Sequence, residues 1–283
     1  MTIGDAILRQ VFNGLVLGSF YALVALGYSM VYGIVRMINF AHGDVFMAGC
    51  FFFLGASFVG PAAGAILSVL GCGLLGIAIY RLAYRPLLQA PRMSLLITAI
   101  GVSLVLSNGV MLISQGQFLF YPNQGISTGR MQLLLLFAAA GLMLALNWVI
   151  RHTRLGLAMR AVSLDQETAS LMGIPVSRVV GITFFLGSAL AAAAAMMSCL
   201  YYGSLHYSMG YLMGIKAFTA AVIGGIGSLP GALLGGLLLG MLETLGTQFL
   251  GSSWKDAFSF LLLILVLLFR PQGLLGKGER TRM

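Results

Sequence analysis

Long apolar runs, separated by short polar or glycine-rich breaks, follow one another along the whole chain. Runs of about 18 or more apolar residues can cross a bilayer as α-helices, whereas a β-barrel would show short alternating strands. The pattern therefore predicts an all-α fold, a polytopic transmembrane helical bundle, with a single transmembrane domain over residues 1–283. The apolar runs lie at roughly 10–33, 45–59, 62–80, 94–114, 131–150, 179–200, 214–226, 231–248 and 257–269.

The runs at 45–59 and 214–226 are too short to cross a membrane alone. Segments 45–59 and 214–226 have about 15 and about 13 residues, and at 1.5 Å per residue neither covers a hydrocarbon core of about 30 Å. Each is joined to a neighbouring run by a polar or glycine-rich break, at 39–44 and at 224–231. We therefore expect about eight spans with broken half-helices. Nine full crossings are the alternative, and they would place the two termini on opposite sides of the membrane.

The two breaks are candidates for a transport path. Broken helices at membrane depth are tolerated only where protein or a watery cavity surrounds them, and one in each half of a chain is typical of transporters. A carboxylate in a later apolar span is a further candidate, because it is costly in lipid. The alternatives are an ordinary polar turn at 39–44 and a structurally paired carboxylate. The candidate path residues are Asn39, His42, Gly43, Asp44, Gly224, Gly225, Gly227 and Glu243.

The composition excludes a soluble enzyme. Hydrophobic residues make up 59% of the chain and charged residues 8%, with a mean hydropathy of +0.99. Soluble domains carry about 25% charged residues. The net charge of +9 comes from 16 basic and 7 acidic residues. In a membrane protein such an excess reflects basic cytoplasmic loops rather than binding to nucleic acid.

The basic residues gather in two loops and the C-terminal tail, which are therefore expected to be cytoplasmic. These segments hold Arg81, Arg85, Arg92, Arg151, Arg154, Arg160, Arg178, Arg270, Lys277, Arg280 and Arg282. The alternate loops are expected to hold only Arg130, Lys216 and Lys255. The charge pattern thus predicts a multi-pass membrane protein with a cytoplasmic C-terminus and a cytoplasmic loop at about 151–178.

This loop contains a short helix with signals at both ends. Ser163 is a good N-cap, and Gln166 three residues later completes a capping box. Gly173 can take the left-handed C′ position, and Pro175 blocks continuation, so the predicted helix spans about 164–172. Isolated helices this short are marginal in water, so we expect another protein to dock on it. A helix lying on the membrane surface is the alternative. The apolar side chains available for docking are Leu164, Leu171 and Met172.

Two other features bear on the class of protein. Glycines spaced by four in the stretch 217–246 allow helices to approach closely, either within this chain or against a partner subunit. No GxxxxGK[ST] motif is present, and the GxGxxG match at 71–76 lies inside an apolar run. The three cysteines form no CxxC pair, and no metal-ligand spacing occurs. We expect a chain that is not an enzyme and that itself holds no metal and no cofactor.

Three stretches together carry a resemblance to a known family. Residues 14–48 (GLVLGSFYALVALGYSMVYGIVRMINFAHGDVFMA) closely resemble the start of the first permease of branched-chain amino-acid ABC importers. Segment 160–175 resembles the EAA-type loop of ABC importer permeases, although it has Glu167-Thr168-Ala169 in place of Glu-Ala-Ala. The glycine-rich run 217–246 is also similar. The resemblance covers nearly the whole chain.

The resemblance implies a permease subunit of the inner (plasma) membrane that imports leucine, isoleucine and valine. Its implied partners are a second similar permease, two ATP-hydrolysing subunits that would hold ATP and magnesium, and a periplasmic substrate-binding protein. Related permeases serve urea, short amides or aromatic acids, and a self-contained channel or ion-coupled carrier is the alternative from another class. The residues implied to couple this chain to the ATPase are Arg160, Ala161, Asp165, Glu167, Ala169, Leu171 and Gly173.

Overall fold

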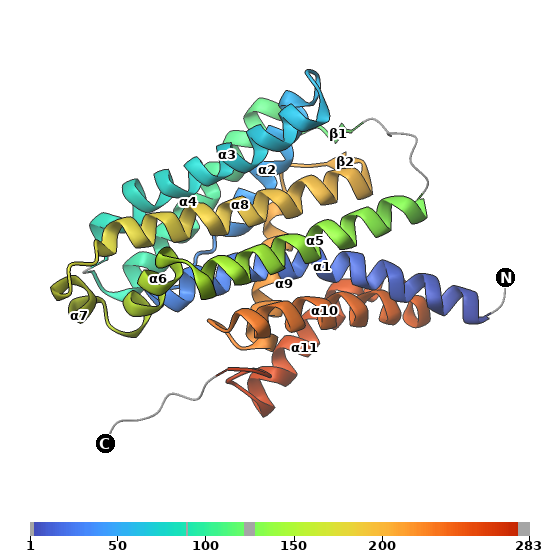
Figure 1. Cartoon of the computed structure of the whole chain (residues 1–283). Coiled ribbons are helices and arrows are strands. Elements are labelled where there is room, and N and C mark those ends of the chain that lie inside the picture. The colour runs from blue at the N-terminus through green and yellow to red at the C-terminus, as the bar shows by residue number, and fades with distance from the viewer. Residues whose placement is uncertain (1–2, 89, 122–127, 277–283) are drawn as a thin grey trace.

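The computed structural model describes residues 3–88, 90–121 and 128–276, and they form a bundle of helices (Figure 1). The α-helices are α1 (Ile3–Val35), α2 (His42–Ser57), α3 (Pro61–Ile79), α4 (Arg92–Ser114), α5 (Thr128–His152), α6 (Arg154–Leu164), α7 (Gln166–Leu171), α8 (Val176–Tyr202), α9 (Met209–Gly224), α10 (Leu229–Leu250) and α11 (Lys255–Phe269). A π-helical turn at Tyr80–Tyr84 and a 3-10 turn at Arg85–Leu87 extend α3, and a 3-10 turn at Ser252–Trp254 precedes α11. Two short antiparallel strands, β1 (Leu119–Phe120) and β2 (Ser204–Leu205), pair at one end of the bundle.

Seven of the helical segments in the described chain are long and apolar enough to cross a membrane. They correspond to α1, α3 with its extension, α4, α5, α8, α10 and α11 with the turn before it. The predicted polytopic helical bundle is therefore confirmed. The strand pair and the π-helical turn were not predicted, because each is too short to leave a periodic pattern in the sequence.

Helix α1 lies at the centre of the bundle. Its most apolar window is 94% buried, and α10, α8, α9 and α5 all pack against it (Figure 1). α10 runs antiparallel to α1, and glycines on both helices bring their backbones together; a Cβ added at Gly18 would lie 2.8 Å from the Leu237 Cα. Close approach of backbones through small residues is the main source of helix packing in lipid. The glycine-rich run therefore serves packing within this chain.

Two further crossings combine an extended stretch with a half-helix. Residues 36–41 leave the end of α1 and lead back to α2, which has 16 residues; residues 203–208 lead from α8 to α9, which also has 16. Seven long spans and these two composite crossings bring the described chain across the bundle nine times. The two ends of the described chain accordingly lie at opposite ends of the bundle (Figure 1).

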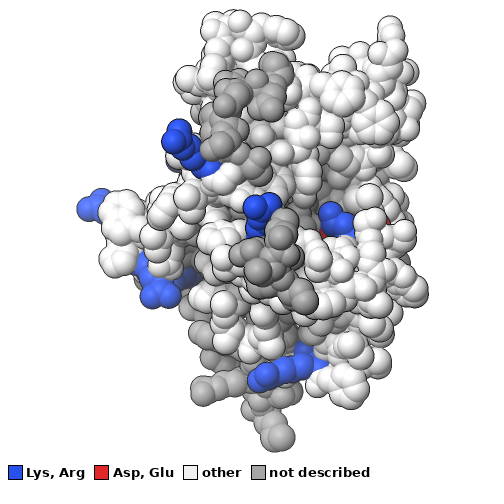
Figure 2. Space-filling model, turned by 90° about the vertical axis from the view of Figure 1, so that its right-hand side faces the viewer, with Lys and Arg blue, Asp and Glu red and all other residues white. Residues whose placement is uncertain are grey.

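The ends of the bundle differ in charge. One end, called the basic end below, carries α6 and α7 together with Arg81, Arg85, Arg151, Arg154, Arg160, Arg178 and Arg270. Figure 2 looks onto the opposite end, where most of the surface is uncharged and the Lys and Arg side chains in view are scattered. One assignment from the charge pattern is wrong: Lys216 is not in a loop but inside α9, with its side chain 7% exposed.

Candidate functional site

The two half-helices begin against one another in the interior of the bundle. Gly43 in the first turn of α2 faces Gly210 and Gly214 in the first turns of α9, and a Cβ added at Gly43 would lie 2.6 Å from the Gly214 Cα. On the other side of α2, His42 lies at the level of Gly187, eleven residues or about 16 Å into α8. Both half-helices therefore start well inside the bundle rather than at its ends, and half-helices of this kind are typical of transporters.

Polar side chains around this junction are buried and mostly paired. Asp44 is 2% exposed, and it accepts a hydrogen bond from the hydroxyl of Ser103 on α4. Asn39 is 3% exposed and accepts a hydrogen bond from the Tyr84 hydroxyl at 2.7 Å. The predicted break at 39–44 is real, but it lies at residues 36–41, because His42, Gly43 and Asp44 form the first turn of α2.

His42 fills the space between α1 and α8. Its ring packs edge-on against Tyr28 with centroids 4.8 Å apart, and a Cβ added at Gly27 would overlap the His42 ring. Its Nε2 atom is buried and has no hydrogen-bond partner in the described chain. His42, Asp44 and Asn39 are thus all buried among packed helices in this conformation.

The second predicted break, at 224–231, is present but shorter: residues 225–228 connect the end of α9 to the start of α10. Gly225 has a left-handed φ of 102°, and the segment after α11 packs on it. The backbone N–H groups of Leu274 and Leu275 donate to the carbonyls of Ile223 and Gly224 at 2.8 and 2.9 Å. These bonds satisfy carbonyls that the end of α9 would otherwise leave free. Gly224, Gly225 and Gly227 therefore have a structural role at this helix end.

Glu243 belongs to a buried ion cluster. Its carboxylate is 0% exposed and lies 2.8 Å from Lys216 Nζ and 3.1 Å from Lys255 Nζ. The Tyr21 hydroxyl donates to it at 2.9 Å, and Lys216 also pairs with Asp256 at 2.7 Å. The cluster joins α1, α9, α10 and the start of α11. Sequence reasoning found Glu243 but missed Lys216, although a lysine within an apolar run was the available signal.

The short helix at the basic end begins later than the sequence predicts. Asp165, not Ser163, is the N-cap of α7: its carboxylate accepts from the Glu167 backbone N–H at 3.0 Å and from the Thr168 hydroxyl at 2.6 Å. Ser163 lies within α6 and donates to the Arg160 carbonyl. The predicted capping box of Ser163 and Gln166 is therefore wrong. Helix α6 was not predicted, because the residues from 151 up to the short helix were interpreted as a loop.

The C-terminal end of α7 matches the prediction. Gly173 is left-handed, with φ of 81°. The N–H of Ile174 bonds to the carbonyl of Ala169, and that of Gly173 to the carbonyl of Ser170, both at 3.0 Å. This pair of bonds is a Schellman motif, which gives a short helix a defined end.

The α6–α7 unit exposes an apolar surface and is anchored to the bundle beneath it. Leu164, Leu171 and Met172 are 82%, 84% and 78% exposed, while Ala169 is buried. Gln166 donates its side-chain N–H to the carbonyl of Ile34 at the end of α1, at 2.9 Å. Arg160, Asp165 and Glu167 are also exposed, and Ala161 is half-buried. A movement of α7 would thus act directly on the end of the central helix.

The charge of the α7 cap is stable at neutral pH. The Thr168 hydroxyl, followed by the backbone N–H groups of Glu167 and Thr168, lowers the pKa of Asp165 below its usual value. A lowered pKa means that the cap is fully present above the ordinary aspartate pKa and is lost only as the pH falls through the lowered value.

Comparisons with known proteins agree on one family. A family model described as the permease component of the branched-chain amino acid transport system matches residues 10–267. The high-affinity branched-chain amino acid transport system permease LivH of Salmonella typhimurium is 43% identical over 296 aligned residues, covering 96% of each chain. BraD of Pseudomonas aeruginosa has the same identity and coverage. A probable branched-chain amino acid permease of Methanocaldococcus jannaschii is 26% identical over 93% of this chain and 91% of its own.

A solved structure shares the fold. The chain aligns with PsaBC of Streptococcus pneumoniae, solved in complex with a Fab, with a TM-score of 0.50. The alignment covers 92% of this chain and 91% of the other, at 15% identity. At this identity the likeness concerns the arrangement of the helices alone.

Proposed function

The chain belongs to the family of branched-chain amino acid transport system permease components, and from this premise we propose that it forms one transmembrane half of an ATP-driven importer for leucine, isoleucine and valine. It is a multi-pass membrane protein and a transport subunit rather than an enzyme. Its place is the inner (plasma) membrane, with the basic end and the C-terminus in the cytoplasm.

The α6–α7 unit carries the proposal for ATP coupling. It presents Leu164, Leu171 and Met172 to solvent on a short helix that is capped at both ends and tied to α1 by Gln166. An exposed apolar patch of this kind is typical of a docking surface. Two ATP-hydrolysing subunits, a second similar permease and a periplasmic substrate-binding protein complete the proposed importer. ATP and magnesium belong to the ATP-hydrolysing subunits.

The candidate path runs through the junction where α2 and α9 begin. Residues Asn39, His42 and Asp44 lie there, and the first turns of both half-helices meet at this depth. To switch the transporter between inward- and outward-facing states, nucleotide binding must favour one of the two states. The contact between α7 and the ATPase would transmit this preference to α1. Gly224, Gly225 and Gly227 form the turn between α9 and α10, and Glu243 belongs to the buried ion cluster. We therefore place none of these four residues in the path.

Co-expression with candidate ATP-hydrolysing and substrate-binding subunits from the same genome tests the proposal. An ATPase should co-purify with the chain, and proteoliposomes should take up labelled leucine only with ATP and binding protein. Unlabelled isoleucine and valine should compete, whereas urea, acetamide and benzoate should not. If only one of these three compounds competed, the substrate would be that of a related permease of the same family rather than a branched-chain amino acid. Uptake without ATP would instead indicate a self-contained channel or an ion-coupled carrier.

A further inference from the structure

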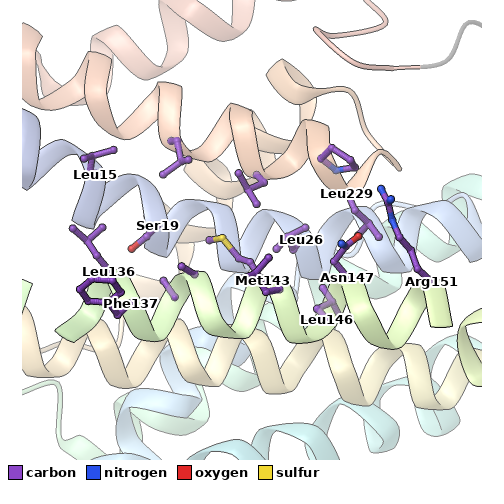
Figure 3. A pocket seen from close by; sticks show the side chains of 16 residues that line it. Leu15, Ser19, Leu26, Leu136, Phe137, Met143, Leu146, Asn147, Arg151 and Leu229 are labelled. Carbon is purple, nitrogen blue, oxygen red and sulfur yellow. The ribbon is translucent and has the colours of Figure 1, made fainter. Parts of the chain in front are cut away.

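An apolar groove runs along the outside of the bundle between α5 and α10, with α1 as its floor (Figure 3). Its volume is about 610 Å3. Leucine, alanine, methionine and phenylalanine side chains make up most of its lining, and Arg151 is the one charged residue among the described residues that line it. The groove is therefore suited to a hydrocarbon chain with one polar end.

The polar end of the groove coincides with the basic end of the bundle. In Figure 3 the Arg151 side chain lies beside Asn147 and Leu229 at one end of the groove, and Leu15 and Leu136 lie towards the other. A second cavity of about 130 Å3, which shares Leu229 with the groove, is lined by Arg160. Neither Arg151 nor Arg160 forms an ion pair with a carboxylate of the described chain. Two guanidinium groups are thus free to bind an anion at this end.

The groove is long enough for an acyl chain. From Arg151 at the basic end, its lining on α5 extends to Leu136, fifteen residues or about 22 Å. The groove therefore starts at the basic end and reaches past the middle of a hydrocarbon core of about 30 Å. Because the basic end lies at the membrane surface in this arrangement, Arg151 and Arg160 are at the depth of the lipid headgroups.

We propose that this groove binds an anionic phospholipid, with an acyl chain along the groove and the phosphate at Arg151 and Arg160. This site is separate from the transport path and goes beyond the proposed function. A free amino acid fits poorly, because none of the described residues that line the groove is a carboxylate that could pair with its ammonium group. A zwitterionic lipid brings its own cation with its phosphate, so it would leave the positive charge of Arg151 and Arg160 unbalanced.

Photocross-linking from the rim of the groove tests the proposal in the assembled transporter. Trp148 is 60% exposed and follows the lining residue Leu144 by one helical turn on α5. The photoreactive residue benzoylphenylalanine replaces Trp148, and the transporter is placed in membranes of phosphatidylcholine with a minor fraction of phosphatidylglycerol. After cross-linking, mass spectrometry identifies the lipid adducts on this chain. Each basic residue at the membrane surface enriches an anionic lipid roughly fivefold. We expect phosphatidylglycerol adducts enriched at least that much over the membrane composition.

Charge variants make the result specific to this site. Arg151→Gln combined with Arg160→Gln should return the adducts to the membrane composition, and Arg151→Lys alone should retain most of the enrichment. Arg178→Gln removes the same charge from an exposed position at the basic end and should change nothing. Three results would overturn the proposal. The share of phosphatidylglycerol among the adducts of the parent chain could equal its share in the membrane, or its enrichment could persist in the double variant. Position 148 could also cross-link to another protein chain.

Discussion

Lys216 Nζ lies 2.8 Å from Glu243 Oε1, and the two side chains join α9 to α10 inside the bundle, where the carboxylate is completely buried. Asp256 at the start of α11 pairs with the same lysine at 2.7 Å. Charges at this depth are tolerated because each has a partner. Lys216 therefore fixes the half-helix α9 to two spans, α10 and α11.

Breaking this pair should destabilise the bundle. Lys216→Met is expected to lower the free energy of unfolding by roughly 3 kcal/mol, because it leaves the Glu243 carboxylate short of a counter-charge. Combining it with Glu243→Gln should cost less than the sum of the two single changes. The midpoint of thermal unfolding in detergent measures each effect.

The control for this experiment is Lys255→Met, which removes the other lysine from Glu243. Its side chain is 38% exposed, so the loss should stay below about 1 kcal/mol. Strict additivity of Lys216→Met and Glu243→Gln would contradict a direct interaction between the two residues.

Contact between the half-helices should be essential for transport. Gly43→Ala places a methyl group against the backbone of Gly210 and Gly214, so α2 and α9 must separate. We expect lost uptake with normal membrane insertion. The matched control is Gly55→Ala on the same helix, where nothing lies within 4 Å and where alanine favours the helix by up to about 1 kcal/mol. Equal uptake by the two variants would show that the junction does not need this close approach.

The left-handed end of α7 gives a second test at the basic end. Gly173→Val is expected to strain the backbone by roughly 1–2 kcal/mol, because a β-branched residue is poorly tolerated at positive φ. No atom lies within 4 Å of the added Cβ, so the effect is one of conformation rather than of collision. Uptake and ATPase association should fall while insertion stays normal. Gly173→Asn, which tolerates this conformation, should retain most of both, and an equal loss in the two variants would argue against a conformational cause.

Cysteine accessibility tests the position of the path. In the conformation described here Asn39 and His42 are 3% and 1% exposed, so Asn39→Cys and His42→Cys should be protected from water-soluble thiol reagents. Each should react in at least one nucleotide state of the assembled transporter. The native Cys50, which is 0% exposed and forms part of α2, should remain unreactive throughout. Protection of both positions in every state would place the path elsewhere. Gly225 is unsuitable for this test, because its φ of 102° and its contact with Gly276 would strain any side chain.

Much of the fold was accessible from the sequence because membrane spans are long and uniformly apolar. The two half-helices could be predicted from their length together with the breaks beside them, since the run at 257–269 is also about 13 residues long but belongs to a full span. Their meeting at Gly43 and Gly214 could not be predicted, because it depends on extended segments that bring each chain back into the bundle.

The details of the candidate sites depended on contacts distant in sequence. The partner of Glu243 is Lys216, 27 residues away, and no local pattern joins them. The N-cap of α7 was misassigned because both Ser163 and Asp165 are good caps, and the preceding α6 continues through Ser163. The left-handed conformation of Gly173 was predicted correctly, because a glycine shortly before a proline at the end of a helical pattern is typical of a helix C-cap.

ATP-dependent leucine uptake by proteoliposomes with a modified α7 tests the central claim most directly. Leu171→Ser with Met172→Ser changes two side chains that are 84% and 78% exposed and touch little of this chain. Phe58→Ser, at a position 88% exposed just after α2 at the opposite end, is the control. The account predicts that the α7 variant inserts normally but loses both the co-purified ATPase and the uptake, while the Phe58 variant keeps both. Wild-type uptake by the α7 variant with the ATPase still bound would contradict it.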